Sequence, residues 1–116
     1  TAKEVSLYDP KTHSLTQVAK GDHRGIVAAN QPFSKEAPVS LLMVADMDKF
    51  GSKGEHAQAM VAVDTGIVTE NINLFCSAAG LATVTRGTMD SKAISALLGL
   101  TENQIPLINN PVGYLK

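Results

Sequence analysis

One long apolar segment constrains the fold of this chain more than any other feature. Residues 55–79 predict a single helix about 37 Å long, at about 1.5 Å per residue. A surface helix of a globular protein normally shows one apolar stripe, whereas here apolar residues cover more than one face. These residues are Met60, Val61, Val63, Ile67, Val68, Ile72, Leu74, Phe75 and Ala78. We therefore expect a central helix that packs against a partner subunit, with Gly80 ending it in the left-handed conformation.

The rest of the chain offers little material to cover such a helix. The chain has 116 residues, which fit one small domain, and it contains two Tyr, three Phe and no Trp. A domain of this size buries roughly two thirds of its unfolded-chain surface. A helix that is apolar on all sides needs more cover than that. We therefore expect additional chain, a partner subunit, or both.

The remaining segments predict a layered domain in which strands alternate with helices. Residues 5–8 and 14–18 alternate apolar and polar side chains around an Asp-Pro turn, which indicates a β-hairpin that includes Tyr8 and Leu15. Asp22 is expected to cap a short helix that ends at Ala29. The other expectations are a loop at 31–38, a strand buried on both faces at 39–45, a mobile polar segment at 46–54, a strand at 81–85, a helix capped by Thr88 or Asp90 that ends at Leu98, and an edge or irregular strand at 105–114.

Composition and spacing exclude several classes of function. The net charge is −1 and no Lys/Arg run occurs, which argues against nucleic acid as a partner. No apolar run is long enough to span a membrane. The single cysteine excludes an internal disulfide and gives a cytoplasmic location as the default. Cys76 is expected to be a buried thiol. No metal-ligand spacing, catalytic Ser-His-Asp order, P-loop or GxGxxG motif is present, so no catalytic or metal-binding residue is assigned.

Two polar positions are the best candidates for a ligand. Arg86 and Gly87 follow a predicted strand, and glycine lets backbone N–H groups approach a planar or anionic group closely. The alternative is an ordinary turn with a solvated Arg86. Asn71 lies among apolar residues of the long helix, where its amide could bind a ligand or could be a satisfied buried group.

Several motifs together resemble the C-terminal part of the nitroreductase superfamily. They are Asp64-Thr-Gly66, Glu70-Asn71, Gly80-Leu81-Ala-Thr83, Arg86-Gly87, Leu97-Leu-Gly-Leu100 and Val112-Gly-Tyr114-x-Lys116. Their order is most similar to the branch of nitroreductase-like proteins and SagB-like dehydrogenases. The resemblance covers nearly all 116 residues, and its specificity lies in the order and spacing of the motifs.

This resemblance implies an α+β fold with a mixed or antiparallel sheet and a homodimer formed through long central helices. It also implies FMN at the dimer seam, where hydride passes from NAD(P)H through flavin N5 to a nitroaromatic, quinone or similar small-molecule acceptor. By position, Val84, Thr85, Arg86 and Gly87 would line the flavin ring, with the backbone N–H groups of Arg86 and Gly87 near its N5/O4 edge. Lys116 would be the cation near the FMN phosphate.

The family's N-terminal motifs, an Arg-Ser-x-Arg phosphate-binding segment and a Ser/Asn-Arg-Gln segment, are not found in these residues. The chain also begins at Thr1 rather than Met. We therefore expect residues 1–116 to be the C-terminal part of a single nitroreductase-like domain. Two alternatives stay open, namely a SagB-type dehydrogenase that oxidises azolines on a modified peptide, and a truncated, flavin-free dimerisation or binding module.

Overall fold

The structure, a computed structural model that describes residues 1–115, has an α+β fold with two antiparallel sheets. Strands β1 and β2 form a hairpin, and the second sheet has the strand order β3-β5-β4. In chain order the elements are β1 (Glu4–Asp9), β2 (Ser14–Lys20), α1 (Arg24–Ala28), the 3₁₀ helix η1 (Pro32–Glu36), β3 (Val39–Asp46), α2 (Met47–Phe50), α3 (Glu55–Ala79), β4 (Leu81–Thr83), α4 (Ser91–Leu98) and β5 (Gln104–Tyr114). The predicted fold class is therefore confirmed.

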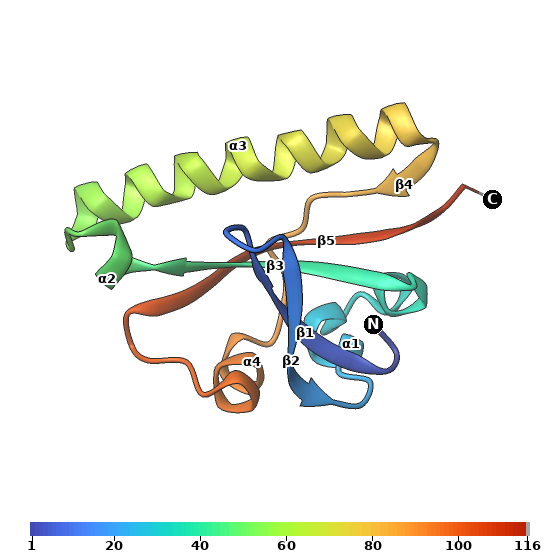
Figure 1. Ribbon diagram of the computed structural model, residues 1–116, viewed down its shortest axis with the longest axis horizontal. Helices are drawn as coiled ribbons and strands as arrows, with labels where there is room; N and C mark the ends of the chain where they lie inside the picture. Colours follow the sequence, from blue (N-terminus) through green and yellow to red (C-terminus); the bar gives the residue numbers. More distant parts are fainter. Residues whose placement is uncertain (116) are drawn as a thin grey trace.

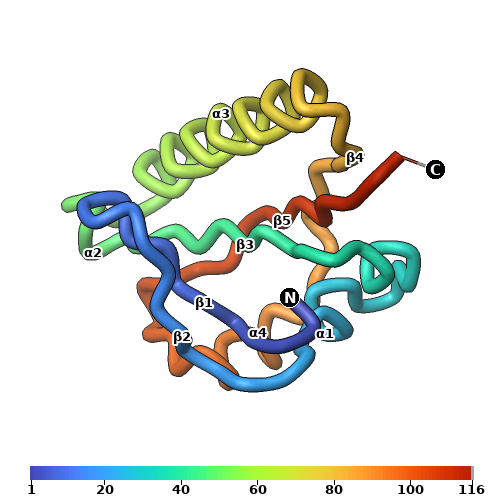
Figure 2. The backbone as a smooth tube through the Cα atoms, turned by 45° about the vertical axis from the view of Figure 1, so that its right-hand side comes forward, coloured from blue at the N-terminus to red at the C-terminus, as the bar shows by residue number. Residues whose placement is uncertain are grey.

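The three-stranded sheet separates two helical layers. Helix α3 runs along one face of this sheet, while α1 and α4 lie on the other face (Figure 1). The tube view shows that α3 has no neighbouring helix along most of its length (Figure 2). A small apolar core fills the contact between α3, α2 and the sheet, with Ala45, Met47, Ala57 and Val61 buried. No helix among residues 1–115 is long and apolar enough to cross a membrane.

Helix α3 spans the predicted residues, and its two sides differ in an unusual way. The side that faces the sheet buries small and hydroxyl-bearing residues: Ala57, Val61, Thr65, Thr69 and Cys76. The Thr65 hydroxyl is satisfied within the helix, because it donates to the Val61 carbonyl at 2.7 Å. Most of the large apolar side chains lie on the outside and are exposed. The helix therefore presents to solvent the side chains that a globular protein normally buries.

Helix α3 ends at Gly80 as the sequence predicts. Gly80 has φ +74°, and its N–H donates to the Cys76 carbonyl. A Cβ added at Gly80 would meet nothing within 4 Å, so a substitution there is limited by backbone conformation alone. Gly66 offers a comparison inside the same helix, because an added Cβ there also meets no neighbour.

We predict opposite effects of alanine at these two glycines. Gly80→Ala should lower the free energy of unfolding by about 1–2 kcal/mol, since a left-handed residue with a Cβ is strained. Gly66→Ala should raise it by about 0.5–1 kcal/mol, because alanine is the better helix former. Urea unfolding followed by circular dichroism measures both. A shift in the same direction for both variants would contradict this assignment of the helix end.

The structure corrects four local predictions. Residues 31–38 contain the 3₁₀ helix η1, and residues 46–54 contain α2, whose first turn is capped by the Asp46 carboxylate at the N–H groups of Asp48 and Lys49. Strand β3 is mostly half-buried, because helices cover its faces only in part.

Helix α1 begins after His23 without a side-chain cap. Asp22 instead accepts from the Arg24 N–H at 3.1 Å and pairs with the Arg24 guanidinium at 2.6 Å. The cap of α4 is Asp90, one of the two predicted residues.

Strand β5 was expected to lie at an edge or to be irregular in part because of its two prolines, and it lies in the centre of the sheet. The register against β3 shifts between Met43, which is opposite Ile108, and Val44, which is opposite Pro106. The bulge interrupts the regular pairing next to Pro106, which has no N–H to donate to the neighbouring strand. The prediction of partial irregularity was thus right, and the prediction of an edge position was wrong.

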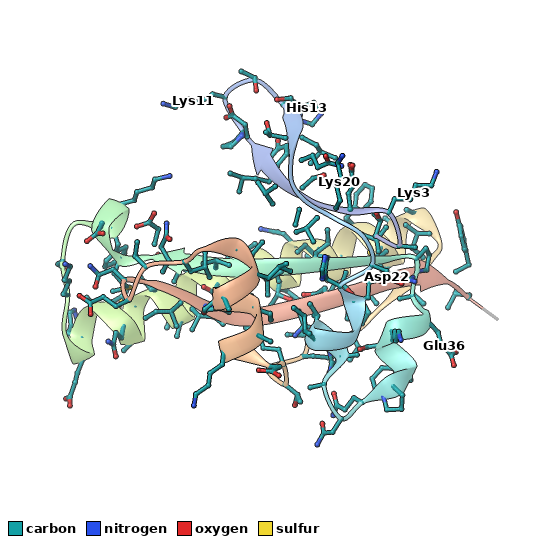
Figure 3. All side chains as sticks on the ribbon, turned by 90° about the horizontal axis from the view of Figure 1, so that it is seen from below. Lys3, Lys11, His13, Lys20, Asp22 and Glu36 are labelled. Atoms are coloured by element: carbon teal, nitrogen blue, oxygen red, sulfur yellow. The ribbon has the colours of Figure 1, made fainter. Side chains whose placement is uncertain are left out.

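The hairpin formed by β1 and β2 projects from the body of the molecule, with Lys11 and His13 at its tip (Figure 3). Tyr8 pairs directly across from Leu15, and both side chains are exposed. The Tyr8 hydroxyl lies 2.9 Å from His13 Nδ1. The predicted hairpin is confirmed.

Candidate functional site

The segment from 84 to 87, called here the strand-end loop, continues the register of β4 without being part of the strand. Thr83 pairs with Val112, and Arg86 forms an isolated bridge with Asn109, which is the same alignment three residues on. Extending that alignment places Val84 opposite Pro111. Because proline has no N–H, the ladder is interrupted there. The predicted strand to residue 85 therefore ends at Thr83, and Val84 and Thr85 are exposed.

Arg86 is buried behind the strand-end loop and makes four hydrogen bonds with its side chain. Only 5% of the residue is exposed. Nε donates to Gln31 Oε1 at 2.8 Å, and Nη2 donates to the Ala28 carbonyl at 2.9 Å. Nη1 donates to the Val27 carbonyl at 3.1 Å and to Asn109 Oδ1 at 2.6 Å. The guanidinium thus joins the loop to the end of α1, to the segment before η1 and to the central strand.

The charge of Arg86 has no carboxylate partner among the described residues. The ion pairs of residues 1–115 are Arg24–Asp22 and Lys53–Asp48. Burial lowers the pKa of the Arg86 guanidinium below its ordinary value, but an arginine stays protonated in proteins. Two of its acceptors are carbonyls at the C-terminal end of α1, where the helix dipole favours a cation. The Phe33 ring centroid also lies 5.8 Å from the guanidinium carbon.

This arrangement rules out the alternative of an ordinary turn with a solvated Arg86. Its side chain is not solvated, and it is not available to a ligand. Its backbone N–H donates to the Asn109 carbonyl at 2.8 Å, and its carbonyl accepts from the Asn109 N–H at 2.8 Å. The expectation that the Arg86 N–H faces the flavin N5/O4 edge is therefore corrected, because sheet pairing uses that donor. Gly87 is exposed next to it.

A network of polar side chains lies on the other face of the sheet, between β5 and α3. Asn110 is completely buried and accepts from the Thr69 hydroxyl through Oδ1. Its Nδ2 donates to Asn73 Oδ1 at 3.1 Å and to Thr83 Oγ1 at 3.2 Å. Asn73 Nδ2 in turn donates to Thr85 Oγ1 at 3.1 Å. The network fixes the distance between the long helix and the strand-end loop.

The number of hydrogens available determines which hydroxyl donates in the pair formed by Thr85 and Thr69. Thr85 Oγ1 lies 2.8 Å from Thr69 Oγ1. A hydroxyl has one hydrogen, and the hydrogen of Thr69 goes to Asn110. Thr85 therefore donates its own hydrogen to Thr69. Its oxygen also accepts from Asn73 Nδ2, so the Thr85 hydroxyl is part of the network between α3 and β5.

A groove of about 600 Å³ adjoins the strand-end loop, between η1 and the ends of β4 and β5. Its apolar lining comes from Phe33, Pro38, Ala82, Val84, Pro111 and Tyr114. The Ser34 hydroxyl is buried at this groove, and among residues 1–115 it has no hydrogen-bond partner. Of the described residues that line the groove, only Glu36 carries a charge.

These features determine what the site can hold. The apolar lining and the unpartnered Ser34 hydroxyl fit a planar ring with a polar edge. Within the described part of the chain, no Lys or Arg lines the groove to pair with a phosphate. Lys116, the predicted phosphate cation, lies outside the described residues. Within residues 1–115 no group of three or more His, Cys, Asp or Glu side chains could hold a metal ion.

The structure brings together part of the predicted set and separates the rest. Val84, Thr85 and Gly87 are exposed along one loop, with Arg86 buried between them. Asn71 is exposed on α3, so the expectation of a buried amide at that position was wrong. The amide of α3 that meets the loop belongs to Asn73, which is half-buried. Cys76 is a buried free thiol, as predicted.

The sequence analysis missed Asn109 and Asn110, which are both completely buried. Successive residues of a strand point to opposite faces, so one amide meets Arg86 and the other meets Thr69. The available signal was the pair itself, two consecutive amides inside an apolar run between prolines. Buried amides need partners on each face of the sheet.

The fold and the candidate site thus define an α+β chain with a long outer helix and an exposed loop at a strand end beside an apolar groove. The sequence profile of the Nitroreductase family matches residues 2–114. The chain belongs to this family.

Relatives and solved structures agree with that assignment. A protein of Methanocaldococcus jannaschii with a provisional nitroreductase name is 28% identical over 116 residues, covering 94% of this chain and 56% of the relative. The crystal structure of a provisionally named nitroreductase from Ralstonia eutropha JMP134 has a TM-score of 0.87 at 26% identity, covering 98% of this chain and 54% of that chain. A provisionally named NADH oxidase from Clostridium acetobutylicum has a TM-score of 0.59 at 26% identity, covering 71% and 49%. The chain spans about half the length of the relatives it matches.

Proposed function

We propose that this chain is the C-terminal part of an FMN-dependent NAD(P)H oxidoreductase of nitroreductase type, which transfers hydride to a nitroaromatic, quinone or similar small acceptor. Family membership supports the class of reaction. The observation that carries the proposal is the strand-end loop, which the buried Arg86 holds beside an apolar groove. When bound there, FMN would supply the hydride-transfer chemistry that amino-acid side chains lack.

The chain's own residues would bind and orient the ring. Val84 offers exposed apolar surface at the groove, and the exposed Thr85 next to it would line the ring from the loop. Gly87 follows the paired residue of the loop, and its lack of a side chain allows close approach to its backbone. Arg86 acts through the loop and does not touch the ring. The role of Lys116 as a cation for the FMN phosphate stays a prediction.

The outer side of α3 supports a second part of the proposal, a homodimer. Met60, Val63, Ile67 and Leu74 are three, four and seven residues apart and form one stripe, with exposed fractions of 42–59%. The buried residues of α3 lie on the opposite side of the helix. A stripe of this kind is typical of a helix that pairs with a second helix. We propose that a second copy of this chain covers it and that the flavin lies at that seam.

We predict that a charge in this stripe prevents dimer formation. Ile67→Glu should weaken self-association by about 100-fold or more, because the carboxylate would be buried without a partner. The control is Gln58→Glu, which adds the same charge to α3 outside the stripe and should leave association unchanged. Sedimentation equilibrium measures both. A wild-type chain that is monomeric at all concentrations would contradict the proposed homodimer.

A flavin-free dimerisation module is the second candidate function. The absence of Lys and Arg from the described lining of the groove favours it, since that lining offers nothing to an FMN phosphate. This candidate predicts the same dimer but no flavin binding.

Anaerobic reduction tests the oxidoreductase directly. The chain is mixed with FMN, freed of unbound flavin, and titrated with NADH or NADPH while the visible flavin absorption is followed. We expect one of the two nucleotides to bleach the bound flavin, and a quinone or nitroaromatic to restore its colour. Bound flavin that neither nucleotide reduces would contradict the proposed activity.

A further inference from the structure

One buried polar group at the groove contributes nothing to the fold. Ser34 lies in η1 with 2% of its surface exposed, and its hydroxyl has no hydrogen-bond partner among residues 1–115. A buried hydroxyl without a partner makes a protein less stable than alanine at the same position would. Native structures contain few such groups, so each one requires an explanation. For Ser34 the explanation must lie outside the stability of the fold.

Ser34 belongs to one of the two walls of the groove. Helix η1 forms this wall, and the ends of β4 and β5 form the other. The Phe33 ring of η1 has its centroid 5.8 Å from the Arg86 guanidinium carbon, which places the wall next to the strand-end loop. The absence of a side chain at Gly113 lets the walls approach, because a Cβ added there would lie 3.2 Å from Pro38 Cδ. The walls thus meet at Gly113 and Pro38, and Ser34 lines the groove between them.

The charges around the groove limit which ligand can use this hydroxyl. The described lining contains no Lys or Arg, and its one charged residue, Glu36, is a carboxylate. An anionic ligand would lose water in the groove without gaining a partner of opposite sign from residues 1–115. An uncharged ring gains by leaving water, and its carbonyl or nitro oxygen can accept from a serine hydroxyl. The hydroxyl can turn toward such an oxygen by rotation about a single torsion angle.

We propose, on the basis of the proposed function, that the η1 side of the groove is the subsite for the acceptor and that Ser34 donates to a carbonyl or nitro oxygen of that acceptor. The subsite takes uncharged aromatic acceptors in preference to anionic ones of the same shape. Ser34 is therefore a specificity-determining residue, whose hydroxyl serves the ligand and not the fold. This assignment leaves residues 84–87 for the flavin ring.

A matched pair of probes tests the assignment on the chain without flavin. The compounds para-nitrobenzamide and para-nitrobenzoate have nearly the same shape, but only the benzoate is anionic at neutral pH. Each is titrated into the isotope-labelled chain, and the NMR shifts of the backbone amides give both the dissociation constant and the residues affected. We expect the benzamide to bind about fivefold more tightly or better, with the largest shifts at Ser34 and the other residues of the groove.

Two variants and a control separate the hydroxyl from the charge. Ser34→Ala should weaken binding of the benzamide about fivefold, which is the typical contribution of one hydrogen bond. Its midpoint of urea unfolding should equal or exceed that of wild type, because the fold loses no partner. Glu36→Lys should tighten binding of the benzoate about fivefold and leave the benzamide unchanged. Ser52→Ala removes an exposed hydroxyl between α2 and α3 as the control, and should change neither binding nor stability.

The outcomes separate this inference from the proposed function. A lower urea midpoint for Ser34→Ala, or equal affinity of this variant and wild type for the benzamide, overturns the role of the hydroxyl. Equal binding of the two probes to wild type, or no binding of either, overturns the subsite for uncharged acceptors. All of these results leave the proposed flavin chemistry intact. Binding that depends on Ser34, in a chain that retains no flavin, supports the subsite and overturns the oxidoreductase.

Discussion

Arg86→Met is expected to lower the free energy of unfolding by about 2–4 kcal/mol. The substitution leaves the Val27 and Ala28 carbonyls, Gln31 Oε1 and Asn109 Oδ1 without their donor in a buried environment. Part of that loss is offset, because the variant no longer desolvates a charge. A small domain has a total stability of about 5–15 kcal/mol, so the effect is a large fraction. Urea unfolding, followed by circular dichroism, measures it.

Lys92→Met is the matched control, because it removes a positive charge from an exposed position on α4. Its effect should stay within about 0.5 kcal/mol. Equal stability of Arg86→Met and wild type would show that the guanidinium does not hold the strand-end loop to α1. The assignment of Arg86 as the residue that positions the loop would then be wrong.

Asn110→Leu is expected to have an effect of similar size, about 2–4 kcal/mol. Leucine has a similar volume, but it cannot accept from Thr69 or donate to Asn73 and Thr83. The network that joins α3 to the strand-end loop would lose its central member. Thermal and urea unfolding should agree, and the backbone amide of Arg86, which donates to the Asn109 carbonyl, should exchange its hydrogen faster.

Two further variants make the result specific. Thr69→Val removes a direct partner, so its effect should not add to that of Asn110→Leu, and the coupling should exceed about 1 kcal/mol. Asn71→Leu replaces the exposed amide of the same helix and should change stability by less than about 0.5 kcal/mol. A cost for Asn71→Leu that equals the cost for Asn110→Leu would contradict the placement of these amides.

Local sequence signals predicted most of the elements. The span of α3 and the glycine at its end follow from an uninterrupted helical pattern and from the backbone freedom of Gly80. The hairpin follows from alternation around an Asp-Pro turn. The order of the strands in the sheet was harder to predict, because the two prolines indicated either an edge strand or an irregular one. A bulge at Pro106 and an interrupted ladder at Pro111 let both prolines lie in the central strand.

The sequence predicted where in the chain the candidate site lies, but not which way its side chains point or what they contact. The segment around Arg86 was recognised, but the direction of its side chain depends on strand register, which sequence alone does not give. Asn109 and Asn110 lie more than twenty residues from Arg86 and Thr69 along the chain, so no local pattern links them. The expectation of a buried amide at Asn71 was wrong for the same reason. It depended on which side of α3 faces the sheet, and a helix with apolar residues all around hides that information.

The sequence and the structure agree on the outer stripe of α3, which both describe as apolar and without cover from the rest of the chain. The pattern predicted a helix that needs a partner, and the structure leaves Met60, Val63, Ile67 and Leu74 exposed on the side away from the sheet. Exposed apolar patches of this kind mark interaction surfaces. The identity of the partner as a second copy is the proposal that Ile67→Glu tests.

The most direct test of the central claim is the amount of flavin that the chain retains. The purified chain is incubated with excess FMN, passed through a desalting column, and its absorbance spectrum is compared with its protein concentration. We predict a visible flavin band at close to one flavin per chain, with lower retention for a variant that carries Val84→Glu at the mouth of the groove. A colourless protein with full secondary structure would contradict the account and would favour the flavin-free module.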